Sequence, residues 1–241
     1  MIPEPLLAPE SRLQSGAALA LATSAFVIGV LLAGVLGGVA VLVSGSVDSP
    51  LTMAAGFVGL WIPMVGAGVM ASRRFGSGSV GRDLGFRLAF PVDLGLALVV
   101  ALCGMVASGL VQFALSPFPR LLGSNTGFIA DQRGTIAGVV VVVGSTLVGA
   151  PLVEELFFRG LVLRALLPKL GWAAVVIQAV VFGLIHFDPT EGLGNVGVIA
   201  GVGVFGLVQG IAAWRLGRIG PTILSHALFN AVAVVPVLLG H

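Results

Sequence analysis

The sequence predicts an all-α fold, a polytopic membrane helical bundle of about seven transmembrane helices. Three observations support this prediction: 57% of the 241 residues are hydrophobic, only 9% are charged, and the mean hydropathy is +1.12. Soluble domains carry roughly 25% charged residues, so this composition cannot cover a water-soluble surface. We therefore expect a multi-pass protein of the cell membrane whose surface is solvated by the lipid bilayer.

Seven apolar runs reach or approach the roughly 20 residues that a membrane-spanning helix needs. The first run exceeds the roughly 7–15 apolar residues of a signal-peptide core, so we expect it to be a retained helix. The fourth run is too long for a straight crossing and indicates a tilted or extended helix. The predicted helices cover about residues 17–43, 51–71, 92–115, 135–166, 171–187, 196–214 and 219–239.

Basic residues are concentrated in every second loop, and short loops rich in Lys and Arg tend to remain cytoplasmic. This alternation predicts a cytoplasmic N-terminus and a C-terminus outside. Because the basic residues form no continuous stripe and the net charge is only +2, we expect no nucleic-acid partner. The basic residues that indicate the cytoplasmic side are Arg12, Arg73, Arg74, Arg82, Arg87, Arg164, Lys169, Arg215 and Arg218.

Charged residues and histidines that lie well inside the predicted helices occur only in the C-terminal half. Each costs about 2.5–3.5 kcal/mol at the centre of a membrane helix on insertion scales, so each is expected to be paired or functional. We therefore divide the chain into a cytoplasmic tail over 1–15, three helices with their loops over 16–134, and a C-terminal core of four helices over 135–241 that carries these residues. The singled-out residues are Glu154, Glu155, Arg159, His186 and His226, with Asn230 as a polar companion.

The fourth predicted helix contains VEELFFRG, in which Glu155 and Arg159 are four residues apart and can form an ion pair. Glu154 is rotated about 100° from Glu155 in an α-helix and can point elsewhere. We therefore expect Glu155 to brace the structure and Glu154 to be available as a general base for a water molecule. Both glutamates could instead only hold helices together through Arg159.

Two further pairs share the four-residue spacing that places side chains on one helix face: Phe182 with His186, and His226 with Asn230. A histidine and an amide can both donate hydrogen bonds to a developing oxyanion. Carboxylates and these donors together are the groups that water-mediated amide hydrolysis requires. Straight helices of about 1.5 Å per residue place His186 near the outer end and His226 about 10 Å from the cytoplasmic end, so the site requires tilted or offset helices.

The succession EExxxR, FxxxH and HxxxN resembles the CPBP family of CAAX prenyl proteases and bacteriocin-processing intramembrane proteases, also called Abi proteins. The similarity covers about residues 135–235, and DLGFR at 83–87 resembles a stretch ahead of the family's third helix. The resemblance implies a helical bundle that encloses a water-accessible chamber. It also implies an intramembrane endopeptidase that acts on a membrane-bound peptide or protein, in CAAX-type members a prenylated one.

The resemblance also implies roles for individual residues. Glu154 and His186 would activate a water molecule, and His226 and Asn230 would stabilise the oxyanion. The geometry would be supported by Glu155, Arg159 and Phe182. A divalent metal, zinc, is left open: Glu154, His186 and His226 could supply the two-histidine-plus-carboxylate set of a catalytic zinc site, but the same residues also work without metal.

Two other functions remain compatible with the sequence. The chain could be a catalytically silent immunity or regulatory protein that keeps the fold for binding. It could also be a proton-coupled transporter, because intramembrane carboxylates and histidines form proton relays. Transporters of this kind usually contain a repeated half with paired broken helices, and the sequence shows no such repeat.

Overall fold

The computed structural model describes residues 13, 15–124 and 126–240, so most of the predicted tail over 1–15 lies outside the described residues. The described residues form helices, turns and loops, and they contain no strand. Six helical segments among them are long and apolar enough to cross a membrane, and a seventh apolar helix is shorter. The prediction of a polytopic helical bundle is therefore confirmed, and the protein is a multi-pass membrane protein.

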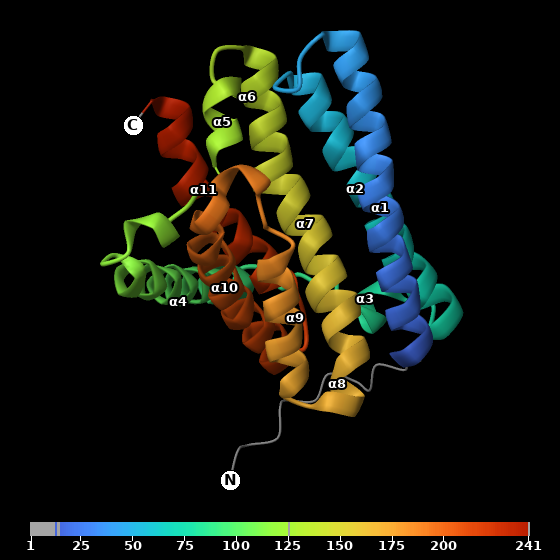
Figure 1. Cartoon of the computed structure of the whole chain (residues 1–241). Coiled ribbons are helices and arrows are strands. Elements are labelled where there is room, and N and C mark those ends of the chain that lie inside the picture. The colour runs from blue at the N-terminus through green and yellow to red at the C-terminus, as the bar shows by residue number, and fades with distance from the viewer. Residues whose placement is uncertain (1–12, 14, 125, 241) are drawn as a thin grey trace.

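Helices α1 (Ser15–Ser44) and α2 (Pro50–Phe75) form an antiparallel pair on one side of the molecule (Figure 1). The pair is closely packed where a Cβ atom on Gly59 would lie only 2.6 Å from Cα of Ala33. Small residues allow such close approach between helices in lipid. Helix α2 begins at Ser49, whose side chain accepts a hydrogen bond from the Thr52 backbone, as is typical of an N-cap.

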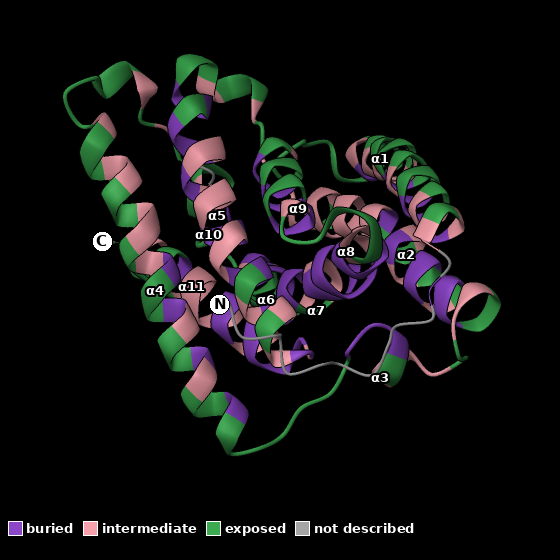
Figure 2. Cartoon of the chain, turned by 90° about the horizontal axis from the view of Figure 1, so that it is seen from below, coloured by how far each residue is buried: buried purple, intermediate pink, exposed green. Residues whose placement is uncertain are grey.

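The short helix α3 (Val80–Asp83) leads to α4 (Val92–Leu115), which packs against α10 (Asn195–Leu216) and α11 (Gly220–Leu239). Helix α4 lies on the side of the molecule opposite to α1 and α2 (Figure 2). Exposed residues follow the outer faces of α1 and α4, and buried residues gather around α7 and α8 between them (Figure 2). The lipid-facing helices thus enclose the segment that carries the glutamates.

After η1 (Pro119–Leu121) and α5 (Gly127–Gln132), the chain forms one helical segment from residue 136 to residue 170. This segment confirms the over-long fourth helix. It is not a regular α-helix, because two π-helical stretches interrupt it, and such stretches occur frequently at functional sites. The parts are α6 (Ile136–Val143), η2 (Gly144–Gly149, π), α7 (Ala150–Glu154), η3 (Glu155–Leu163, π) and α8 (Arg164–Leu170).

Helix α9 (Ala173–Leu184) is shorter than the predicted 171–187, because the chain leaves the helix after Leu184 and enters the 3₁₀ helix η4 (Pro189–Gly194). Its 12 residues span about 18 Å, less than the roughly 30 Å of the bilayer core. One end of α9 therefore lies within the apolar layer. Helix α1 begins at the end of the bundle where α8 and α9 meet, and α11 ends at the opposite end (Figure 1).

The DLGFR segment and the loop between α10 and α11 are joined at the end of the bundle near α8. The backbone of Ile219 donates to the Gly85 carbonyl at 2.9 Å. Nη2 of Arg164 donates to the Gly217 carbonyl at 2.6 Å, and Arg218 pairs with Asp93 at 2.6 Å. Arg164, expected in a loop, is thus a buried residue of the long helical segment. Gly85 has a φ of +67°, which a glycine adopts without strain.

Candidate active site

A cavity of about 380 Å³ brings together the four residues predicted to be catalytic. Glu154 comes from the end of α7, His186 from the turn after α9, and His226 and Asn230 from α11. All four line the cavity, together with apolar side chains that include Phe229. Segments separated by up to 76 residues, from Glu154 to Asn230, therefore meet at one place inside the helical bundle.

The two adjacent glutamates have different surroundings, as their positions on the helix predict. Glu154 is half-buried at the cavity, and its side chain has no hydrogen bond or ion pair with the described residues. Glu155 is fully buried, and its Oε1 lies 2.9 Å from Nη1 of Arg159. The predicted Glu155–Arg159 pair is present, and of the two glutamates Glu154 is the one that lines the cavity.

His226 is held by the second glutamate. Its Nδ1 lies 3.1 Å from Oε1 of Glu155, the same oxygen that Arg159 contacts. Because a carboxylate only accepts hydrogen bonds, Nδ1 of His226 carries the hydrogen of this bond. The ring is 4% exposed and lies edge-on to the Phe205 and Phe182 rings. Nε2 is thereby left as the nitrogen that can interact with a bound molecule.

His186 and His226 meet at Phe182, and this contact resolves the mismatch in depth that straight helices imply. The ring centroids of Phe182 and His186 are 4.8 Å apart, and those of Phe182 and His226 are 6.0 Å apart. The physical reason is the shortness of α9, which ends inside the apolar layer. Nδ1 of His186 lies 2.7 Å from the Phe182 carbonyl and must donate to it, so Nε2 of a neutral His186 is an acceptor.

Asn230 is oriented by the backbone of the long helical segment. Its Nδ2 donates to the carbonyl of Thr146 at 2.7 Å. Thr146 lies in the π-helical stretch η2, so this stretch sets the direction of the amide. An amide nitrogen carries two hydrogens, and the second remains available for a further hydrogen bond.

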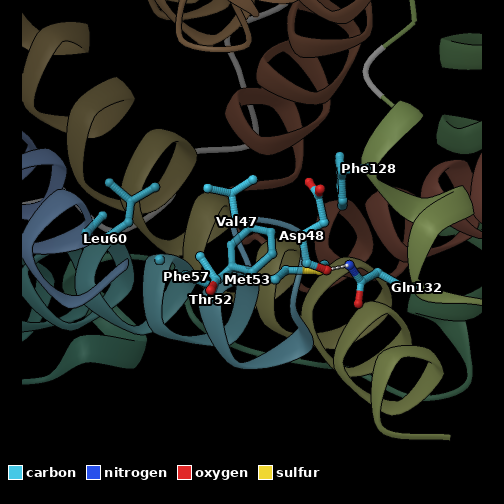
Figure 3. A pocket seen from close by; sticks show the side chains of 10 residues that line it. Val47, Asp48, Thr52, Met53, Phe57, Leu60, Phe128 and Gln132 are labelled. Atoms are coloured by element: carbon cyan, nitrogen blue, oxygen red, sulfur yellow. Dashed lines mark hydrogen bonds between the residues drawn. The ribbon is translucent and has the colours of Figure 1, made fainter. Parts of the chain in front are cut away.

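A second cavity of about 370 Å³ lies beside the first, between α2, α5 and the end of α1 (Figure 3). The two cavities share the side chains of Phe57, Leu60 and Phe128. Most of the second cavity is lined by apolar groups, and its polar residues include Asp48 and Gln132, whose amide donates to the Asp48 carbonyl (Figure 3). An apolar space thus adjoins the polar one.

Comparison with known families yields a match over the C-terminal part of the chain. Residues 136–232 match the family model described as type II CAAX prenyl endopeptidase Rce1-like. This part of the chain is similar to that family. Comparison with curated proteins and with solved structures yields no match. The matched segment runs from α6 to the second half of α11 and contains every predicted site residue. The match confirms the resemblance to CAAX prenyl proteases that the three motifs indicated.

Several residues around the Rce1-like site were not identified from the sequence. They are Thr146, Gly206 and Gln178. The Thr146 carbonyl orients Asn230. The Gly206 carbonyl accepts hydrogen bonds from both Arg159 and Gln178. Gln178 carried a detectable signal, because it is a polar residue within an apolar helix, four positions before Phe182. The roles of Thr146 and Gly206 depend on backbone carbonyls, which every residue has, so no sequence pattern identifies them.

The arrangement of the cavity side chains bears on whether the site could hold a metal ion. Within the described residues, no three His, Cys, Asp or Glu side chains are grouped so that they could hold a metal ion. Glu154, His186 and His226 line the same cavity, but in this arrangement they do not form a ligand set.

Proposed function

We propose that the protein is an intramembrane endopeptidase that hydrolyses a peptide bond of a membrane-associated substrate through a water activated by glutamate and histidine. The observation that carries this proposal is the convergence of Glu154, His186, His226 and Asn230 on one cavity. The Rce1-like match over the same residues supports it, since that family is described as CAAX prenyl endopeptidases.

In the proposed mechanism, Glu154 removes a proton from the water. Among the described residues, no basic side chain forms an ion pair with the Glu154 carboxylate, so this carboxylate can accept the proton. Nε2 of His186 accepts a hydrogen bond from the same water and orients it, because Nδ1 is held by the Phe182 carbonyl. The resulting hydroxide adds to the carbonyl carbon of the scissile amide, whose oxygen becomes an oxyanion.

The oxyanion is stabilised from α11. The free hydrogen on Nδ2 of Asn230 and the Nε2 hydrogen of a doubly protonated His226 donate to it. The Glu155 carboxylate at 3.1 Å stabilises the positive charge of that histidine. The C–N bond then breaks while the leaving nitrogen takes the proton from Glu154. One water is consumed, the products are a carboxylic acid and an amine, and Glu154 is again a carboxylate.

The substrate is proposed to combine a peptide with an apolar group. The cavity with Glu154 accepts the scissile bond, and the neighbouring cavity offers an apolar space of about 370 Å³ (Figure 3). That space suits an apolar chain such as the isoprenoid group of a prenylated cysteine. Because both cavities share Phe57, Leu60 and Phe128, a substrate could occupy them at the same time.

The test compares wild type with Glu154→Gln in proteoliposomes, using a library of prenylated and unprenylated membrane peptides and mass-spectrometric detection of cleavage. Loss of a general base is expected to lower kcat by about 100- to 10,000-fold. Asp131→Asn, a change of an exposed carboxylate of α5, is the matched control and is expected to retain activity. The same assays with and without a chelator decide whether activity depends on a divalent metal.

The outcomes separate the alternatives. If the Glu154→Gln variant cleaves the peptides as fast as the wild type does, the proposed mechanism is wrong. Absence of cleavage of every peptide by the wild type, together with specific binding of one of them, would favour a silent immunity or regulatory protein. Proton-coupled uptake of a solute by the same proteoliposomes would favour a transporter.

A further inference from the structure

Behind the cavity, a buried carbonyl receives two hydrogen bonds from side chains of different helical segments. Nη2 of Arg159 donates to the carbonyl of Gly206 at 3.2 Å, and Nε2 of Gln178 donates to the same oxygen at 3.0 Å. The side chains of Arg159 and Gln178 have no exposed surface. The Gly206 carbonyl therefore joins the long helical segment, α9 and α10 at one point.

We propose that Gln178 is a positioning residue for the hydrolysis described above, acting through the Gly206 carbonyl and Arg159. We use the name buried clamp for Glu155, Arg159, Gln178 and Gly206. The inference rests on the proposed function, because positioning is measured through catalysis. Gln178 lies outside the three motifs that predict the site.

The buried clamp connects directly to His226. Arg159 contacts Oε1 of Glu155 at 2.9 Å, and that oxygen holds Nδ1 of His226 at 3.1 Å. A guanidinium is planar, with donors in fixed directions, so its partners determine its orientation. If one donor of the Gly206 carbonyl is removed, the carbonyl and Arg159 can shift together. Such a shift changes the direction of the His226 ring.

The same clamp connects to His186 through α9. Gln178, Phe182 and His186 follow one another at intervals of four residues, so Gln178 precedes the histidine by about two turns. The guanidinium carbon of Arg159 lies 4.1 Å from the centroid of the Phe182 ring, whose backbone carbonyl binds His186. Gln178 thus fixes α9, which leads into the turn with His186, against the Gly206 carbonyl. The same carbonyl accepts a hydrogen bond from Arg159, which contacts the carboxylate that holds His226.

Glycines of α10 make this contact possible. A Cβ atom on Gly206 would lie 2.9 Å from Cδ1 of Phe182 and 3.3 Å from Nη2 of Arg159. A Cβ atom on Gly210 would lie 2.5 Å from Nε2 of Gln178. Gly206 and Gly210 therefore do more than allow two helices to pack. They make room for the two side chains that bind the Gly206 carbonyl.

The test is Gln178→Met, which retains a side chain of similar length and removes the amide donor. Full-length protein in proteoliposomes is assayed with a peptide that the wild type cleaves. We expect kcat to fall about 10- to 100-fold, since small displacements of catalytic groups cost up to about 100-fold, with KM unchanged within about twofold. A variant that only reduced the amount of folded enzyme would leave kcat per folded molecule unchanged.

Gln112→Met is the matched control, because Gln112 of α4 also donates to a glycine carbonyl of α10, that of Gly197, at 3.0 Å. It lies outside the cavity and the buried clamp, and its kcat is expected to equal that of the wild type. Where Gln178→Met does not yield folded protein, Gln178→Asn, which keeps the amide but shortens its reach, is expected to show the same fall in kcat.

A double-mutant cycle with Gly206→Ala provides the second measurement. If both residues act through one carbonyl, the double variant with Gln178→Met should be about as slow as the slower single variant. If the falls in kcat of the two single variants multiply in the double variant, the proposed role of Gln178 is wrong. It is also wrong if the folded Gln178 variant has a kcat within twofold of the wild type. Failure of the proposed function is distinguishable, because in that case Glu154→Gln would retain cleavage.

Discussion

The cavity and the buried clamp lie on two sides of the same stretch of helix, and each contains one of two adjacent glutamates. Glu154 is half-buried at the cavity and has no protein partner among the described residues. Glu155 is fully buried and shares one oxygen between Arg159 and His226. Two glutamate side chains thus occupy opposite environments, because adjacent residues of an α-helix point about 100° apart around the helix axis.

This difference indicates how the two regions should respond to substitution. The cavity carboxylate is free to take up a proton, and its loss should affect catalysis more than folding. The clamp carboxylate compensates a buried guanidinium, and removing one member of a buried pair leaves an uncompensated charge.

The largest effect on stability is expected for Glu155→Leu or Arg159→Leu. Breaking a buried pair typically costs about 3–5 kcal/mol. Thermal unfolding in detergent should show a large fall in the melting temperature for each single variant. Glu154→Gln should melt close to the wild type, since Glu154 has no partner among the described residues. A double variant Glu155→Leu/Arg159→Leu should be more stable than either single variant, and the opposite order would contradict the pairing.

A smaller effect, confined to catalysis, is expected for Asn230→Ala. Removal of one oxyanion donor lowers kcat by about 100- to 1000-fold, which corresponds to roughly 3–4 kcal/mol of transition-state stabilisation. The melting temperature should change little, because the side chain is half-buried and makes one hydrogen bond, to Thr146. Equal loss of stability and activity would instead place Asn230 with the structural residues.

The smallest effect concerns a third carboxylate, Asp83, which is buried outside the membrane-spanning helices. Burial raises its pKa, but hydrogen bonds from the Ser72 hydroxyl at 2.7 Å and the Ser77 backbone at 2.9 Å outweigh this effect, so the pKa is lowered from 3.8. Hydrogen bonds to charged groups contribute about 1.5–3 kcal/mol each. Ser72→Ala should therefore lower the melting temperature less than the clamp variants do.

The sign of the pH dependence follows from the lowered pKa of Asp83. Its carboxylate stabilises the fold fully at pH values above the ordinary 3.8, and this contribution is lost as the pH falls through the lower folded-state value. The melting temperature of the wild type, measured between pH 7 and pH 3, should decrease at the acid end. Asp83→Asn should decrease less over the same interval, and an equal decrease would exclude Asp83 as the cause.

Much of the fold could be predicted because the bilayer imposes a simple length rule on apolar segments. The ends of α4, for example, agree with the predicted 92–115. The prediction was less accurate where the chain departs from a regular α-helix. The π-helical stretches at Gly144–Gly149 and Glu155–Leu163, and the early end of α9, depend on tertiary contacts that hydropathy does not register.

The sequence by itself determined which residues belong to the candidate site, because ionisable groups are costly inside a membrane and the few that occur stand out from an apolar background. It also determined which glutamate pairs with Arg159, because that depends on spacing along one helix. Only the tertiary structure decided that His186 and His226 meet at Phe182, that Glu155 also holds His226, and that Gln178 shares a carbonyl with Arg159. These contacts join residues far apart in the chain, and helix length, tilt and backbone carbonyls set them.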